Sequence, residues 1–151
     1  MEKKVPLGVR LCNPGNLRTN LKSYWKGQIG SENGFCWFYN NYYGVRAMVY
    51  LLEKYYKRGW LDSPLEFVSH YAPESDGNNV KKYAEFVSSA FDDKLHIIHL
   101  AILIMQQEIG IKYVDDELMF NASYHCRIFF KKHVESGKVD FETGFSWNYV
   151  C

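Results

Sequence analysis

From Tyr43 onward, apolar residues recur at the spacing of one helix face, and this pattern predicts a mainly helical chain. The first helix closes at Gly59. Ser63-Pro64 predicts the start of a second helix that ends near Pro73, because serine caps helix N-termini and proline suits the first turn. A polar loop over 73–79 then precedes a third helix at about 80–91. The apolar face of the first helix consists of Val45, Met48, Val49, Leu52 and Tyr56.

The most apolar run, Leu95 to Met105, predicts a central helix that is buried on nearly all sides. Asp92-Asp93 places carboxylates at its expected start, which suits the positive end of a helix. Gly110 ends it at a position typical of left-handed backbone. The run is too short to span a bilayer, so we expect no membrane insertion. A fifth helix is expected from Asp115 to Glu135.

Residues 1–40 show little helical periodicity and are rich in Gly, Asn and aromatic residues. Asn13-Pro14-Gly15-Asn16 is a turn signal, and Phe35 to Tyr39 is dense in strand formers. These patterns predict a small N-terminal β-hairpin or an irregular loop layer. The tail from Thr143 to Trp147 looks irregular. The fold class expected is mainly α (α+β): a single domain over 1–151, with five or so helices around a central buried helix.

The charge balance gives no reason to expect a nucleic-acid or membrane partner, because 18 basic and 17 acidic residues leave a net charge of +1. The four cysteines lack Cys-x-x-Cys or zinc spacing, so reduced, mostly buried thiols are expected. The N-terminus lacks the apolar segment of a signal peptide. We therefore expect synthesis in the cytoplasm, with another export route for any target outside the cell.

Glu108 is the sharpest candidate for chemistry. It lies four residues after Ile104 and seven after Ala101, so it continues the apolar stripe of the central helix. Burial there would raise the pKa of its carboxyl, and glycoside cleavage needs such a protonated acid. The alternative is a glutamate that swings from the last helical turn into solvent, and spacing alone does not decide between the two.

Other titratable residues give weaker signals. Glu135 follows a polar stretch and is expected at a solvated helix end. His96 and His99 have the spacing of a metal pair, but no third ligand or carboxylate cluster supports them, so surface or structural roles are expected. We expect neither a metal nor a cofactor. Arg46 is expected to pair with an acid inside the domain rather than to contact a ligand.

Several short motifs occur in a fixed order and together resemble small phage and prophage proteins known as virion structural proteins. The resemblance covers roughly residues 8–110. In those proteins an aromatic-Ala-Pro segment, an Asn/Asp-rich loop, a tyrosine and a later helix ending in Glu-x-Gly follow one another. The matching motifs are Asn13-Pro14-Gly15-Asn16-Leu17-Arg18, Trp25 to Gln28, Phe35 to Phe38, Tyr43 to Ala47, Tyr71-Ala72-Pro73, Asp76 to Asn79, Tyr83 and Glu108-Ile109-Gly110.

The same motifs are similar to a lysozyme-like glucosaminidase domain of the flagellar type, in a different order. In that family the helix with the catalytic glutamate comes first, whereas here it follows the other motifs. This order is expected of a circular permutation, which is tolerated when chain ends lie close together at the surface. The resemblance implies a lysozyme-like fold, peptidoglycan glycan strands as the partner, and action at the bacterial cell wall or in a phage virion.

The resemblance also implies roles for single residues. Glu108 would be the general acid, and Tyr71 would assist it or position the sugar. Trp25 or Trp37 would be a stacking platform, with core packing as the alternative. The remaining candidates for the substrate groove are Asn13, Asn16, Asp76 and Tyr83, although the two asparagines are more typical of loops held by side-chain-to-backbone bonds.

The reaction stays open because the sequence offers no convincing second carboxylate. Asp76, Glu74 and Glu32 are the options, and a lytic transglycosylase would need none of them. The expected activity is therefore cleavage of peptidoglycan as a muramidase, glucosaminidase or lytic transglycosylase. The alternative is a non-catalytic virion or wall-binding protein with the same fold. We expect a monomer.

Overall fold

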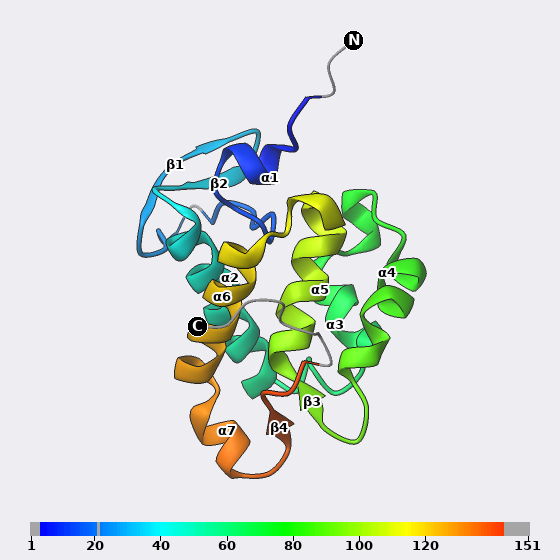
Figure 1. Ribbon diagram of the computed structural model, residues 1–151. Helices are drawn as coiled ribbons and strands as arrows, with labels where there is room; N and C mark the ends of the chain where they lie inside the picture. The colour runs from blue at the N-terminus through cyan, green and yellow to red at the C-terminus, as the bar shows by residue number, and fades with distance from the viewer. Residues whose placement is uncertain (1–3, 21, 144–151) are drawn as a thin grey trace.

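The computed structural model describes residues 4–20 and 22–143, which form a mainly helical structure with a small antiparallel hairpin, as predicted (Figure 1). Short 3-10 turns occur at Glu74–Asp76, Ser88–Ala90 and Ile111–Tyr113. The helices are α1 (Leu7–Arg10), α2 (Asn41–Lys57), α3 (Pro64–Tyr71), α4 (Val80–Val87), α5 (Ile97–Ile109), α6 (Asp116–Phe129) and α7 (Lys131–Glu135), and the strands are β1 (Gln28–Glu32), β2 (Phe35–Phe38), β3 (Leu95–His96) and β4 (Val139–Asp140).

Helix α5 is the centre of the fold, as the apolar run predicted. It stands between α2 and α6 on one side and α3 and α4 on the other (Figure 1). Ile98, Ile102 and Met105 are fully buried. Their burial removes apolar surface from water, which is the main driving force for packing the other helices around α5. The helix ends before Gly110, whose φ of 96° is unfavourable for other residues.

The predicted cap of α3 forms, and α2 has a similar cap that was not predicted. Ser63 Oγ accepts a hydrogen bond from Glu66 N at 3.1 Å, with Pro64 in the first turn of α3. Asn40 Oδ1 does the same for Tyr43 N at 3.2 Å, so α2 begins slightly before the expected position. These bonds satisfy backbone donors that a helix leaves unpaired at its start.

The predicted start of the central helix at Asp92-Asp93 is wrong. Strand β3 instead pairs in parallel with β4, and His96 Nδ1 lies 2.7 Å from Asp140 Oδ1. Asp92 and Asp93 lie exposed before this strand. The backbone of 95–96 therefore bonds to a segment far along the chain, and a local pattern cannot reveal that partner.

The predicted helix from Asp115 to Glu135 is interrupted at Phe130, which separates α6 from α7. Glu135 is exposed at the end of α7, as expected. Helix α1 was not predicted, because its four residues are too few for a periodic pattern. Of the tail predicted to be irregular, only Thr143 is among the described residues, and both chain ends lie outside them.

The N-terminal hairpin forms as predicted from β1 and β2. Its two turn residues, Asn33 and Gly34, have φ values of 54° and 83°, as a tight two-residue hairpin turn requires. Phe38 points inward into a second small core with Leu17, while Trp37 points outward and is 44% exposed. The hairpin thus packs the N-terminal segment against α2.

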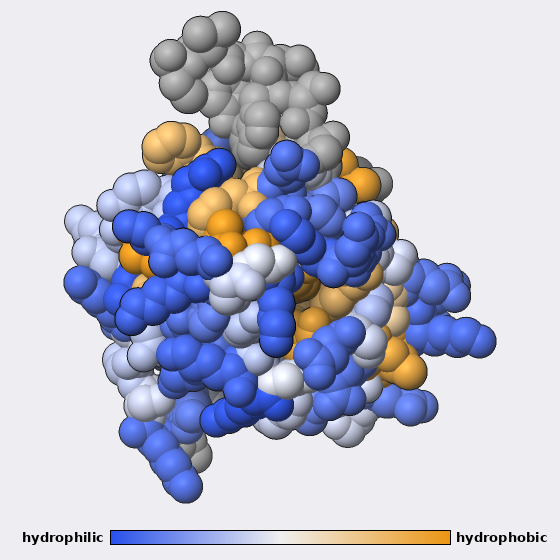
Figure 2. Space-filling view, turned by 90° about the horizontal axis from the view of Figure 1, so that it is seen from below, coloured by the Kyte–Doolittle hydropathy of each residue, from blue (hydrophilic) through white to orange (hydrophobic). Residues whose placement is uncertain are grey.

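Three cysteines are described and all are free thiols: Cys12, Cys36 and Cys126. Arg46 does not pair with an acid among the described residues, which corrects the expectation; its guanidinium lies over the rings of Tyr50 and Phe129. None of the helices within 4–20 and 22–143 has the length and apolarity to cross a membrane. The face at the α7 and β4 end is mostly hydrophilic, with hydrophobic side chains in small separate patches (Figure 2).

His125 gives the fold a pH dependence. It is 1% exposed, its Nε2 lies 3.0 Å from Tyr42 O, and burial lowers its pKa from 6.5 to about 4. Between these pH values the unfolded chain binds a proton that the folded chain does not, so stability decreases as the pH falls. We expect the urea midpoint to decrease from pH 6.5 to 4, and to decrease less in His125→Gln. Equal pH dependence of the urea midpoint in both proteins would show that His125 is not its source.

Candidate active site

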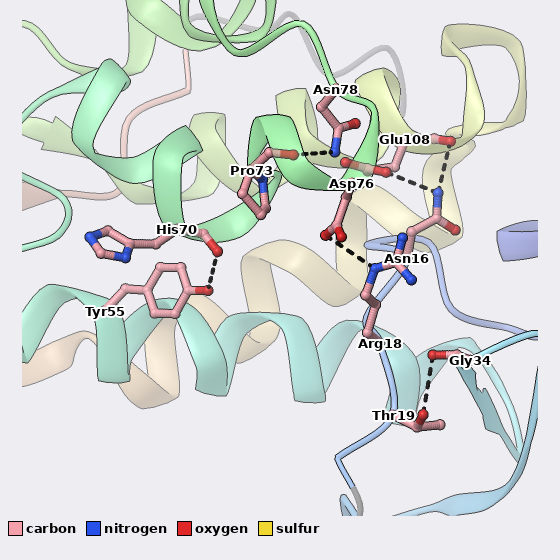
Figure 3. A network of polar contacts seen from close by, with 10 residues as sticks. All are labelled: Asn16, Arg18, Thr19, Gly34, Tyr55, His70, Pro73, Asp76, Asn78 and Glu108. Carbon is pink, nitrogen blue, oxygen red and sulfur yellow. Dashed lines mark hydrogen bonds and ion pairs between the residues drawn. The ribbon is translucent and has the colours of Figure 1, made fainter.

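A cleft of about 470 Å³ lies between the Asn13–Arg18 loop, the hairpin and the loop that follows α3. Figure 3 shows the polar side chains that meet there. Glu108 enters the cleft from the end of α5, and Asp76 enters from the loop after α3. The polar lining includes Asn16, Arg18, His70, Asp76, Asn78 and Glu108.

The buried side chain of Asn13 holds the Asn13–Arg18 loop in place through hydrogen bonds with the backbone. Asn13 is completely buried, and its Nδ2 donates to Leu17 O and Cys36 O at 3.0 Å each. Its Oδ1 accepts from Leu17 N at 2.9 Å. Asn13 therefore joins the loop to β2 and does not line the cleft, which decides between the two roles considered for it.

Asn16 has a different role from Asn13. Its φ of 49° is unusual for a residue other than glycine and turns the side chain toward α5. Nδ2 of Asn16 donates to Glu108 Oε1 at 2.9 Å and to Glu108 O at 3.2 Å. The loop thus reaches the end of the central helix and fixes one side of the glutamate.

Glu108 is half-buried and is held from a second side by Tyr83, whose hydroxyl donates to Oε2 at 2.8 Å. Burial raises the pKa of Glu108 above its usual value, although the bonds from Asn16 and Tyr83 and the charge of Arg18 act in the opposite direction. The side chain lies in the cleft rather than in bulk solvent. It has the properties expected of a carboxyl that donates a proton.

The two tyrosines take different places. Tyr71 lines the cleft, and its hydroxyl donates to Gly15 O at 2.6 Å. Tyr83 is only 3% exposed and lies behind Glu108, where it positions the carboxyl rather than meeting a ligand. Burial holds the pKa of each tyrosine well above 10, so both hydroxyls keep their protons near neutral pH.

Neither tryptophan proposed as a stacking platform lines this cleft. Trp25 packs edge-on against Tyr50 at a ring distance of 5.8 Å, and Trp37 lies on the outer side of the hairpin. The aromatic surfaces that do line the cleft include Phe35 and Tyr55. The sequence named neither as a cleft residue: Phe35 occurs there only as part of the Phe35 to Phe38 motif, and Tyr55 belongs to no motif.

Of the three carboxylates considered as a partner for Glu108, only Asp76 lines the cleft. Its Oδ2 lies 3.3 Å from Nε of Arg18, so an ion pair joins the two loops (Figure 3). Glu74 is exposed outside the lining, and Glu32 pairs with Arg10.

The histidines considered as a metal pair have other contacts. His96 pairs with Asp140, and His99 Nε2 lies 3.1 Å from Ser89 Oγ. Within the described ranges, no three His, Cys, Asp or Glu side chains come together as a metal site would require.

Comparison with protein-family models gives no match, and comparison with curated proteins gives none either. The interpretation of the cleft therefore depends on its own geometry and on the ordered motifs.

Replacing Tyr83 by phenylalanine tests how Glu108 is held. The hydroxyl stabilises the carboxylate form, so its loss should raise the pKa of Glu108 further. We expect the ¹³C resonance of the Glu108 carboxyl to titrate at higher pH in Tyr83→Phe than in the parent. Tyr56→Phe, in α2 against the rings of Phe130 and His133, should leave it unchanged. A lower titration pH in Tyr83→Phe would contradict the assignment.

Proposed function

We propose that this protein cleaves the glycan strand of peptidoglycan, with Glu108 as the general acid. The observation that carries the proposal is a half-buried carboxyl of raised pKa at the wall of a cleft large enough for sugar rings. The order of the motifs that include Asn13 to Arg18 and Glu108 to Gly110 supports a lysozyme-like domain in permuted order. The place of action would be the bacterial cell wall or a phage virion.

In this proposal the proton on Glu108 passes to the oxygen of the glycosidic bond as that bond breaks. Asn16 and Tyr83 occupy one lone pair on each carboxyl oxygen, and each oxygen keeps a second lone pair for a proton. Both residues hold the carboxyl in one orientation. Tyr71 already donates to Gly15, so its hydroxyl oxygen can only accept a further hydrogen bond, which would help to orient the sugar.

Two reactions are open after the proton transfer. Asp76 could deprotonate a water molecule that attacks the sugar, which would give a new reducing end. Alternatively, the 6-hydroxyl of the muramic residue attacks its own anomeric carbon and gives its proton to Glu108, now a carboxylate, which leaves an internal anhydro ring and restores the protonated acid. The ion pair of Asp76 with Arg18 would have to adjust in the first reaction and not in the second.

A second candidate function is binding to the cell wall, or a structural role in a virion, without cleavage. Both oxygens of Glu108 accept hydrogen bonds, and this arrangement would also suit a carboxylate that only ties α5 to its neighbours. Incubation with purified insoluble peptidoglycan separates the two functions. Cleavage predicts soluble sugar fragments in the supernatant, whereas binding alone predicts co-sedimentation with none.

A further inference from the structure

Arg18 is the residue of the cleft whose charge the mechanism above leaves unused. Its guanidinium is held in place twice: Nε pairs with Asp76, and the group lies over the ring of Phe35 at 4.7 Å from the centroid. An arginine fixed in this way loses little further freedom when it binds a ligand. Its orientation is therefore set before any ligand arrives.

The terminal nitrogens of Arg18 remain open to a ligand. Within 4–20 and 22–143, neither Nη1 nor Nη2 donates to a protein acceptor, and the side chain is 53% exposed. Figure 3 shows Nε facing Asp76, with the other two nitrogens turned away from that carboxylate. Two parallel N–H groups of this kind match the two oxygens of a carboxylate.

We propose that Arg18 binds a carboxylate of the glycan strand, so that the cleft selects sugars with a free acid group close to the bond that Glu108 attacks. This inference rests on the proposed function and adds the class of substrate. A carboxylate on the terminal nitrogens would leave the Nε pair with Asp76 intact. Selection thus needs no rearrangement of the two loops.

Binding at Arg18 would also act on Glu108. The positive charge of Arg18 lowers the pKa of Glu108, and a bound carboxylate would cancel part of that effect. Asp76 and His70 also line the cleft, and Tyr71 and Tyr83 face Glu108 in protonated form. Among these groups, Arg18 is the cation that an acidic substrate would neutralise. The acid would then stay protonated to higher pH when substrate is bound.

Two parts of peptidoglycan carry such carboxylates. One is the lactyl group of the muramic sugar, which is a free acid only where the peptide has been removed. The other is the stem peptide itself. If the lactyl group is the ligand, a reaction that hydrolyses the amide between sugar and peptide must supply the preferred substrate.

The test compares three substrates: intact peptidoglycan, strands stripped of peptide by an amidase, and the same stripped strands with their acid groups converted to uncharged amides. We expect the parent to show a kcat/KM at least about 10-fold higher on the charged than on the amidated stripped strands, mainly through KM. In Arg18→Gln this ratio should fall to about one. Arg10→Gln, an exposed arginine outside the cleft, should keep the parent's ratio.

The outcomes separate this inference from the proposed function. Equal kcat/KM on the charged and amidated stripped strands, together with no Arg18-dependent preference for intact strands, would overturn the inference and leave the function standing. Higher activity on intact than on stripped strands, lost in Arg18→Gln, would assign the carboxylate to the peptide. Co-sedimentation of Glu108→Gln with the same strands gives a readout independent of cleavage. If no strand is cleaved, the proposed function fails. Binding that requires the acid groups of the strands and is lost in Arg18→Gln would then still support the inference, whereas no such binding would overturn the inference as well.

Discussion

Glu108→Gln is expected to reduce glycan cleavage by about 10³-fold, because loss of a positioned general acid typically costs 10²- to 10⁴-fold in rate. Glutamine keeps the size of the side chain and can still accept from Asn16, so the cleft should stay intact and binding should persist. The measurement is the rate at which soluble fragments leave purified peptidoglycan. Glu135→Gln is the matched control, since it removes an exposed glutamate at the end of α7.

The same substitution should stabilise the fold near neutral pH. Burial raises the folded-state pKa of Glu108 above its usual value of 4.5, so the folded protein favours the protonated form. The stability linked to that proton is present below pH 4.5 and is lost as the pH rises through the folded pKa. Glutamine does not titrate. The difference in Tm between Glu108→Gln and the parent should therefore increase with pH. A difference that decreases with pH would contradict a raised pKa of Glu108 in the folded state.

Gly44→Ala is expected to destabilise the protein by about 2 kcal/mol, although alanine is the better helix former by about 1 kcal/mol. Gly44 lies in α2, and a Cβ there would come within 1.9 Å of Cys12 O. A backbone carbonyl cannot rotate away as a flexible side chain can, so the segment that leads into the Asn13–Arg18 loop must shift. Urea denaturation measures the loss of stability.

The shift should also reach the cleft. Asn16 lies four residues after Cys12 and donates a hydrogen bond to the Glu108 carboxyl. Displacement of Asn16 would therefore weaken that hydrogen bond. We expect Gly44→Ala to lose activity as well as stability. Gly30→Ala is the control, because the nearest atom to its Cβ would be Trp37 Cε3 at an ordinary 3.7 Å. Unchanged stability in Gly44→Ala would show that the loop is not packed as described.

The parts of the fold that sequence predicted are those in which local pattern and global packing agree. Helix α5 is apolar on nearly all sides and is central, and the strand formers from Phe35 to Tyr39 supply the second strand of the hairpin. The place of Glu108 on the apolar stripe was also readable, because helical periodicity fixes which residues share a face. Its contacts with Asn16 and Tyr83 join segments far apart in sequence, and no spacing rule reveals them.

Predictions that failed did so where a distant segment overrode the local signal. The residues before α5 pair with β4 instead of extending the helix, and Arg46 stacks on aromatic rings instead of meeting an acid. Trp25 and Trp37 have side chains that could stack on a sugar ring, but neither lines the cleft. Trp25 packs against Tyr50, and the alternation of side chains along β2 places Trp37 on the outer face of the hairpin. Arg18 was visible only as part of a motif, and its pairing with Asp76 needs the folded chain.

The most direct measurement of the central claim is mass spectrometry of the sugar ends produced from purified peptidoglycan by the parent and by Glu108→Gln under the same conditions. If Glu108 is the acid, the parent yields glycan fragments with new reducing ends or with anhydro ends, and Glu108→Gln yields almost none while still co-sedimenting with the wall. The same fragments in equal amount from both proteins would contradict the role of Glu108. Co-sedimentation of the parent without any fragments would contradict cleavage itself.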